Sequence, residues 1–411
     1  MKLVIPSLSL LFLAATATAG DWPVWRGPNG NGHAAEGEKP PTVWAQKKNV
    51  LWMVEIPGRG HSSPILIGDK ILLTTADESS QSQSVLCLSR ADGSEIWTKE
   101  INRGGFEKKI HQKNTHASPT LGSNGESVFG VFNNNGSVQV FALDLDGNKL
   151  WSKNVGAFRG RYPFGYAPSP LLHDGKVIVA SEFEKDGYIV ALDQKSGDEI
   201  WRISRPGSTS YSSPIVANVS GKEQLLISGQ EKVSSFDPET GKNLWSVAGT
   251  THATCGTLVW NDDTVFASGG YPDKETIAVK ADGSGKVLWR NKDKSYEQSL
   301  LVVGGHVYTL NDGGIAICWD AKTGEEKWKE RLGGPVSSSP IYAGGHIYAT
   351  NERGITFVFK PNPERYEEVA KNQLGDEGFP TPVFVDDKIY IRTATHSGGG
   401  RQEWLVCIGQ E

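Results

Sequence analysis

The chain has 411 residues, among them 48 glycines and 13 tryptophans, and a formal net charge of −5 at pH 7. Gly-rich turns together with many aromatic residues are typical of antiparallel folds built from many short strands. A weakly acidic chain has no overall charge that favours nucleic acid or an anionic membrane surface, so we expect neither as a partner.

The first 19 residues have the pattern of a secretory signal peptide. Lys2 precedes an apolar run from Leu3 to Ala15, and Ala17-Thr18-Ala19 offers a small-x-small cleavage site. The apolar run is shorter than the roughly 20 residues that span a bilayer. We therefore expect a periplasmic or secreted protein with no transmembrane span after cleavage.

A unit of four predicted short strands recurs along the chain, and such repeats indicate a ring or solenoid. Turn signals such as Asp174-Gly175 separate the first two strands of a unit. Most units end in a Trp, which predicts an aromatic wedge between neighbouring sheets. The copies run from Ser62 to Trp97, Ala117 to Trp151, Pro168 to Trp201, Ser212 to Trp245, Thr254 to Trp289, Gln298 to Trp328, Ser338 to about Val369, and from Thr381 onward.

The last copy lacks its fourth strand, and the segment Asn49–Ile56 before the first copy matches one, including Trp52. The two ends are therefore predicted to complete one blade together, which removes exposed sheet edges. We predict an all-β, eight-bladed β-propeller over residues 49–411, preceded by an N-terminal arm over residues 20–48. An open solenoid is the alternative, but it would need polar capping repeats at both ends.

Three segments carry a more specific signal: ALDQKSGDEIW (Ala191–Trp201), SFDPETGKNLW (Ser235–Trp245) and CWDAKTGEEKW (Cys318–Trp328). They resemble the repeat of pyrroloquinoline-quinone enzymes, roughly A-x-D-x-x-T-G-x-x-x-W. The segment DWPVWRGPNGNG (Asp21–Gly32) resembles the leader of exported bacterial propellers of this class. The resemblance covers nearly the whole chain after the leader, and it implies an eight-bladed propeller.

This resemblance implies two kinds of function. Quinoprotein dehydrogenases hold pyrroloquinoline quinone and Ca²⁺ in such a propeller, whereas relatives such as the propeller of the outer-membrane protein assembly machinery are non-catalytic scaffolds. The sequence has no adjacent Cys pair and no convincing acidic cluster for calcium. We therefore favour a non-catalytic binding or protein-interaction scaffold without cofactor or metal. The alternative is a small quinoprotein oxidoreductase that oxidises an alcohol or sugar with the quinone and calcium.

The cysteines are predicted to be free. Cys87, Cys318 and Cys407 occupy the small-residue position of the third strand in different units, where Ala142 and Ala191 stand in other units. Equivalent positions in different blades should lie well beyond the roughly 7 Å between Cα atoms that a disulfide allows. We expect buried thiols that pack as small apolar groups.

The candidate site lies in the loops that join successive units, which should surround the channel mouth. His61, His116 and Tyr211 each stand three residues before the Pro of their unit, which predicts one ring of side chains. Loops of this kind on a rigid scaffold commonly bind ligands. We expect an envelope protein or an anionic or polyhydroxylated ligand to contact a monomer here; the alternative is that the loop aromatics pack locally. The candidate residues are His61, His116, Arg159, Arg161, Tyr166, Tyr211 and His252.

Overall fold

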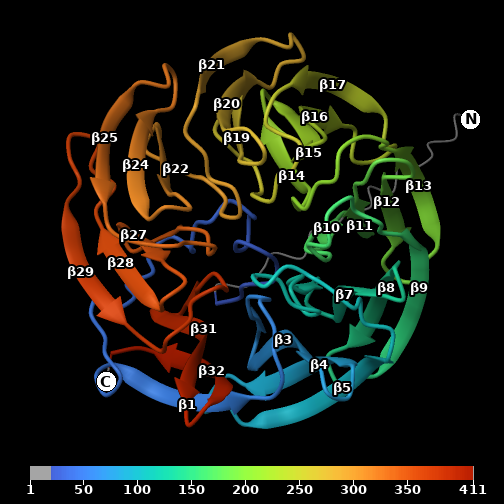
Figure 1. Ribbon diagram of the computed structural model, residues 1–411, viewed down its shortest axis with the longest axis vertical. Coiled ribbons are helices and arrows are strands. Elements are labelled where there is room, and N and C mark those ends of the chain that lie inside the picture. The colour runs from blue at the N-terminus through green and yellow to red at the C-terminus, as the bar shows by residue number, and fades with distance from the viewer. Residues whose placement is uncertain (1–19, 411) are drawn as a thin grey trace, which may run out of the picture.

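The computed structural model describes residues 20–410, which form a ring of eight four-stranded antiparallel sheets around a central channel (Figure 1). The predicted eight-bladed β-propeller is thereby confirmed. The predicted signal peptide lies outside the described residues. Within residues 20–410 there is no helix of the length and apolar character needed to cross a membrane.

The first four blades follow the order of the chain from the innermost to the outermost strand. Their strands are β2 (Ile65–Ile67), β3 (Lys70–Asp77), β4 (Ser82–Ser89) and β5 (Glu95–Arg103); β6 (Gly122–Ser123), β7 (Ser127–Asn134), β8 (Ser137–Asp144) and β9 (Lys149–Ala157); β10 (Leu171–His173), β11 (Lys176–Ser181), β12 (Tyr188–Asp193) and β13 (Glu199–Ser204); and β14 (Ile215–Val219), β15 (Lys222–Gly229), β16 (Lys232–Phe236) and β17 (Asn243–Ala248).

The remaining blades continue in the same way, and the eighth takes its outermost strand from the start of the chain. Their strands are β18 (Val259–Trp260), β19 (Thr264–Gly269), β20 (Glu275–Lys280) and β21 (Val287–Asn291); β22 (Leu301–Val303), β23 (His306–Leu310), β24 (Ile315–Asp320) and β25 (Glu326–Arg331); β26 (Ile341–Ala343), β27 (His346–Thr350), β28 (Ile355–Phe359) and β29 (Glu368–Gln373); and β30 (Val383–Val385), β31 (Lys388–Ser397), β32 (Gly400–Ile408) and β1 (Val50–Ile56).

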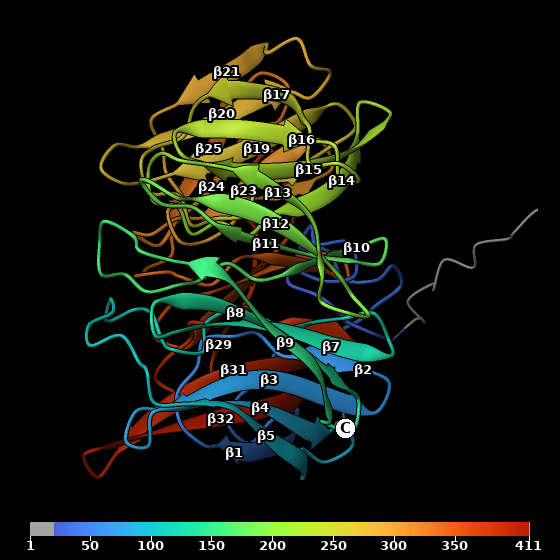
Figure 2. The same ribbon diagram turned by 90° about the vertical axis from the view of Figure 1, so that its right-hand side faces the viewer.

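The antiparallel order gives the ring two different faces, seen edge-on in Figure 2. The face with the connections between blades and the loops between second and third strands is called the loop face. The opposite face, made of the tight turns between first and second and between third and fourth strands, is called the turn face. The longer loops therefore surround one end of the channel only.

Ring closure occurs as the sequence predicts. β1 pairs antiparallel with β32, with Val54 opposite Leu405, and completes the sheet β1-β32-β31-β30. Ile56 is buried in the core shared by this blade and its neighbours. The first regular strand of the chain is thus the outer strand of the last blade.

The repeated Trp residues are wedges between blades, as predicted. The indole N–H of Trp151 donates to the backbone carbonyl of Gln194 in the next blade at 2.9 Å. Gly197, in the same turn, has φ +72°, and a Cβ there would lie 2.7 Å from the Trp151 ring. The turn needs glycine both for its left-handed backbone and for the room that the indole takes.

A ring of hydroxyl side chains joins the blades around the channel. In every blade a Ser or Thr stands two residues before the innermost strand: Ser63, Thr120, Ser169, Ser213, Thr257, Ser299, Ser339 and Thr381. The backbone N–H of one member donates to the hydroxyl of the next, as from Ser63 to Thr120 and from Thr120 to Ser169, both at 3.0 Å. These eight positions, called ring residues below, give a structural register for comparing blades.

The N-terminal arm crosses the channel from the turn face. Trp22 forms an antiparallel bridge with Leu66 of the first blade. Arg26 is buried and donates to the carbonyl of Leu300 at 2.8 Å. The indole N–H of Trp25 donates to the hydroxyl of ring residue Thr257 at 3.0 Å. The arm thus divides the channel into a part open to each face.

All four cysteines are free, as predicted. Cys87, Cys318 and Cys407 are buried, and Cys255 is half-buried beside the channel. Burial raises the pKa of the Cys87 thiol to about 12, so this thiol stays protonated near neutral pH.

Candidate functional site

A cavity of about 210 Å³ occupies the loop-face part of the channel. Its wall has two layers, and Trp25 of the arm lines it from the turn-face side. One layer contains ring residues. The other consists of the residues two positions before each ring residue, here called the mouth positions: His61, Ser118, Ala167, Tyr211, Cys255, Glu297, Ser337 and Phe379. The fold thus places one side chain from every blade at this mouth.

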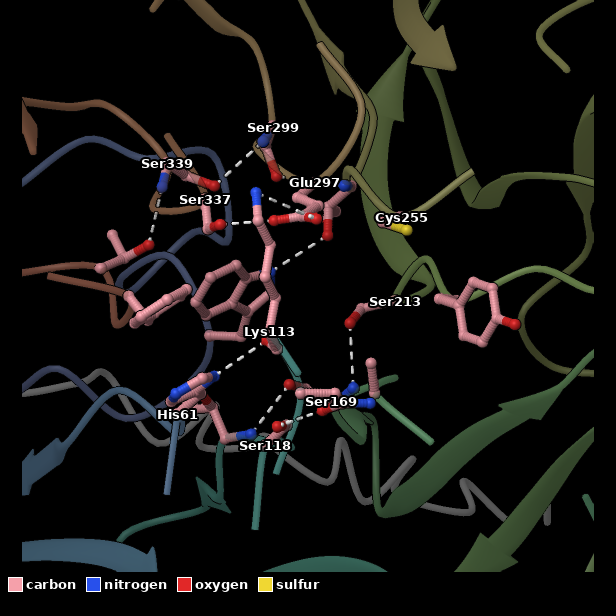
Figure 3. Close-up of a pocket in the computed structure, with 18 of the residues that line it drawn as sticks. His61, Lys113, Ser118, Ser169, Ser213, Cys255, Glu297, Ser299, Ser337 and Ser339 are labelled. Carbon is pink, nitrogen blue, oxygen red and sulfur yellow. Dashed lines mark hydrogen bonds and ion pairs between the residues drawn. The ribbon is translucent and has the colours of Figure 1, made fainter. Parts of the chain in front are cut away.

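An ion-pair network holds one side of the cavity together (Figure 3). The Lys113 ammonium lies 2.6 Å from Glu352 Oε1 and 3.8 Å from Glu297 Oε1. The Ser337 hydroxyl contacts Oε1 of Glu352 at 2.6 Å and also contacts Oε2 of Glu297. Burial opposes the charge of Lys113, but the two nearby carboxyl groups outweigh it and raise the pKa of this ammonium.

The Ser337 hydroxyl lies within hydrogen-bonding distance of both Glu297 and Glu352. Burial raises the pKa of Glu297, whereas the Lys113 ammonium and the Ser337 hydroxyl act to lower it. Lys113 therefore offsets part of the negative charge that the two carboxyl groups bring to this wall.

His61 is a neutral wall residue. Its ring stacks on Phe379 with centroids 4.4 Å apart and an interplanar angle of 5°. Nδ1 lies 3.1 Å from the backbone carbonyl oxygen of Lys113, which can only accept, so Nδ1 carries the hydrogen. Enclosure by protein, followed by the charges of nearby arginines, lowers the pKa of His61 well below its usual value.

Two further wall residues, Cys255 and Tyr211, keep their protons near neutral pH. Burial raises the pKa of the Cys255 thiol, so it is protonated near neutral pH. Tyr211 is buried, and burial raises the pKa of its phenol too. Aromatic faces and hydroxyl groups therefore dominate the cavity, and this surface suits a neutral polyhydroxylated molecule better than an anion.

The structure divides the predicted site residues into separate groups. His61 and Tyr211 line the cavity together, at equivalent mouth positions. The prediction that His116 shares this position is wrong, because ring residue Thr120 makes Ser118 the equivalent of His61. His116 instead stacks on Phe106 with centroids 4.0 Å apart.

Tyr166 also lies outside the cavity. It is buried, and its hydroxyl donates to the Ala180 carbonyl at 2.8 Å. His252 is exposed on the loop face, where Nδ1 lies 2.8 Å from the Ser208 hydroxyl and Nε2 lies 3.6 Å from Glu231. These residues sit around the cavity and do not line it.

Arg159 and Arg161 are exposed beside a cluster of aromatic rings on the loop face. The Arg161 guanidinium lies 5.7 Å from the centroid of the Tyr162 ring. Tyr162 stacks on Phe164 at 5.1 Å and meets Tyr271 edge-on at 5.5 Å. The four residues Arg161, Tyr162, Phe164 and Tyr271 are called the Arg161 patch below.

Glu297, Ser337 and Glu352 were not among the predicted site residues. Glu297 and Ser337 were detectable in principle, because each stands two residues before a ring residue in its unit. Aligning the units on Ser-Pro hides Glu297, because Glu297-Gln298-Ser299 is not followed by Pro. Ser337 stands three residues before Pro340, as His61 does before Pro64, so that alignment could have found it. Glu352 lies in a loop between second and third strands, where no repeated residue marks it.

Comparison with known proteins gives the family. The model of the family described as outer membrane protein assembly factor BamB matches residues 22–161, 81–309 and 273–398. BamB of Burkholderia pseudomallei (strain K96243) is 22% identical over 334 residues, which are 66% of this chain and 78% of that protein.

Two solved structures share the fold at low sequence identity. The crystal structure of BamB from Moraxella catarrhalis has a TM-score of 0.63 and 15% identity, covering 87% of this chain and 98% of that one. Quinohemoprotein alcohol dehydrogenase from Comamonas testosteroni has a TM-score of 0.68 and 13% identity, covering 97% and 82%. A BamB structure and an alcohol dehydrogenase are therefore both similar to this chain in backbone. Because the family model spans most of the sequence, this chain belongs to the family of outer membrane protein assembly factor BamB.

Proposed function

We propose that this protein is a non-catalytic scaffold of the cell envelope that binds another envelope protein through its loop face. The observation that carries the proposal is the Arg161 patch, in which one arginine and three aromatic rings gather on exposed loops. Tyr271 alone keeps 41% of its surface exposed. Tyrosine and arginine are the residue types that most often dominate the energy of protein interfaces.

Membership of the BamB family supports a protein partner from outer-membrane assembly, because the family description names that role. The arrangement of the loops supports the same face. Turn-face turns such as Lys195-Ser196-Gly197 and Glu239-Thr240-Gly241 repeat with little change, whereas the loop-face segments differ between blades. Variable loops on a rigid scaffold are where recognition is usually found.

The loop-face cavity does not fit the quinone and calcium of the enzyme-type relatives. A calcium ion needs several anionic or carbonyl oxygens free to coordinate it. Here the Lys113 ammonium already lies between Glu297 and Glu352, at 3.8 and 2.6 Å from their oxygens. Among residues 20–410, no three His, Cys, Asp or Glu side chains gather as a metal-binding group.

We predict that the protein does not bind pyrroloquinoline quinone tightly. After incubation with the quinone and CaCl₂ and removal of free quinone by gel filtration, the absorption spectrum should show no retained chromophore. The physical reason is that the Lys113 ammonium already pairs with the carboxyl groups that would hold the ion. Stoichiometric retention, or quinone-dependent oxidation of an alcohol or sugar, would contradict this prediction.

Replacing Arg159 and Arg161 by Ala should weaken partner binding without unfolding the protein. Both side chains are exposed, so we expect the free energy of unfolding to change by about 0.5 kcal/mol or less. Capture of the partner should weaken more at low salt, where surface charges are screened less. A thermal melt and a salt series of binding measurements check the two parts. A double variant that unfolds readily would show that these arginines have a structural role.

Site-specific photo-crosslinking in living cells tests the proposed face directly. A photoreactive amino acid at Tyr162 or Tyr271 should give an adduct with another envelope protein, identified by mass spectrometry. The matched controls carry it at Lys195 or Glu239, in turns of the turn face. Adducts from the control positions alone would overturn the proposal.

A further inference from the structure

The innermost strands present backbone groups to the channel near the turn face. In each blade the third residue after the ring residue is here called the edge residue. In seven blades it stands next to the closing pair of a tight turn, as Leu66 opposite Ile71 does. In the longer hairpin of the fourth blade, Val216 stands two pairs further from the turn, at a pair of the same kind. Pairs at this place in an antiparallel hairpin are not hydrogen-bonded to each other, so their N–H and C=O groups point away from the partner strand. The edge residues are Leu66, Ser123, Leu172, Val216, Trp260, Val302, Tyr342 and Phe384.

The arm binds these backbone groups in two neighbouring blades. Trp22 donates to the carbonyl of Leu66 at 2.9 Å and accepts from its N–H at 3.0 Å. The N–H of Ser123 in the next blade donates to the carbonyl of Pro23 at 2.9 Å. Two consecutive arm residues therefore bridge two adjacent edge residues as an extended peptide.

The arm returns to the same positions on the other side of the ring. Tyr342 donates to the Gly32 carbonyl at 2.8 Å and accepts from the Ala34 N–H at 2.9 Å. His33 Nε2 lies 2.7 Å from the carbonyl oxygen of Val302. The arm thus uses the edge residues of four blades.

The third, fourth and fifth blades have the same register and no arm residue bridged to them. Leu172 lies opposite Val177, Val216 opposite Leu225 and Trp260 opposite Val265, each matching Leu66 opposite Ile71. All three edge residues line a cavity of about 460 Å³ on the turn-face side of Trp25. Their outward backbone groups therefore face this cavity.

The rest of this cavity combines apolar side chains with neutral polar groups, among them Asn29, Asn31 and Asn218. Pro170, Leu171, Pro214 and Ile215 contribute from the blades, and Val24 and Pro28 contribute from the arm. Its one acidic lining residue, Glu223, lies 3.3 Å from His173 Nε2. Such a surface suits an uncharged chain with apolar side chains.

We propose that the turn-face cavity binds an extended peptide segment of a partner protein, with apolar side chains, through the outward backbone groups of Leu172, Val216 and Trp260. The arm is the evidence for the occupant, because it binds equivalent groups of other blades in this way. Addition of an extended segment to a free strand edge is a common mode of peptide recognition. The inference does not rest on the loop-face function, since Trp25 separates the two cavities.

The probe is a synthetic peptide that copies residues 20–25, acetyl-Gly-Asp-Trp-Pro-Val-Trp-amide. In the arm these residues bridge Leu66 and Ser123, and Leu172 and Val216 form the same kind of adjacent pair. Added to the protein without residues 1–19, the peptide should slow amide hydrogen exchange at Leu172 and Val216. A peptide N-methylated at its first Trp loses one hydrogen bond and should bind roughly five- to tenfold more weakly.

Two protein variants provide the matched test. Val216→Pro removes the outward N–H and should weaken binding by a similar factor, whereas Val216→Ala keeps that N–H and should bind like the parent. If Val216→Pro does not fold, the N-methylated peptide still removes one expected backbone hydrogen bond, that of its first Trp with the Leu172 carbonyl, on the intact protein. The proposal would be overturned if N-methylation left the affinity of the peptide unchanged. It would also be overturned if the peptide slowed amide hydrogen exchange only at residues other than Leu172 and Val216. If residues 1–19 block the peptide when they are retained, the occupant is the chain's own N-terminus and the assignment to a partner is wrong.

Discussion

A chain that lacks residues 43–56 is expected to lose its cooperative unfolding transition. The deletion, bridged by a flexible linker, removes β1 and leaves β32 with an unpaired edge. It also removes Ile56 from the core and Trp52 from its contact with Tyr390, whose ring centroid lies 6.0 Å away. Thermal and urea unfolding followed by circular dichroism measure the effect, and a transition like that of the full chain would contradict the expectation.

A circular permutant tests whether the defect comes from the missing β1 or from changing the chain connection near it. The permutant begins at Pro57 and joins Gln410 to Gly20 through a short linker. The join is feasible because Gly20 lies beside Asp386 while Gly409 lies beside Lys388, in the same turn region. All native pairings are retained, so this variant should unfold cooperatively. If the permutant fails as the deletion does, the defect lies outside the shared blade.

Replacing Arg392 by Met should destabilise the fold by about 3 kcal/mol, because it removes the buried partner of Glu403 Oε2 and leaves only Arg401, which pairs with Oε1 at 2.7 Å. The side chains of Arg392 and Glu403 are each 1% exposed, and Arg392 Nε lies 2.8 Å from Glu403 Oε2. Arg392 also donates to the Thr74 carbonyl at 2.7 Å, which ties the last blade to the first. Urea unfolding of the variant measures the change.

Two further variants make this prediction specific. Arg103→Met breaks an ion pair with Glu100 whose side chains are 63% and 41% exposed, and it should change stability far less. The double variant Arg392→Met/Glu403→Leu removes both buried charges, so it should lose less stability than Arg392→Met alone. If Arg392→Met lowers the free energy of unfolding no more than Arg103→Met does, the buried ion pair of Arg392 and Glu403 does not stabilise ring closure.

The sequence predicted the ring well because each blade repeats the same order of strands, turn residues and packing residues. A Ser-Pro before the inner strand and a Trp in the outer strand recur in most units, and the orphan strand around Trp52 revealed the shared blade. The His116 assignment failed for a local reason. The second unit has its Pro before ring residue Thr120, whereas the first unit has its Pro after Ser63, so alignment on Pro shifts the register by two residues.

The path of the arm was not predictable in the same way. Residues 20–48 have no repeat and no strand period, so the sequence indicated only an arm. Its position depends on isolated contacts with distant blades, such as Trp25 with Thr257 and Arg26 with Leu300. The Lys113 network likewise combines three loops that are close only once the ring exists.

The pairing of β1 with β32 also sets an order on folding. Val54 leaves a ribosome or a translocation pore long before Leu405, yet each needs the other to satisfy its backbone. Intermediate blades can form their own hairpins from local contacts, but bringing the ends together has a loop-closure entropy cost that only the complete chain can recover. The first strand therefore stays unpaired until β32 has been made, so the chain is most exposed to aggregation and proteolysis in the interval before closure.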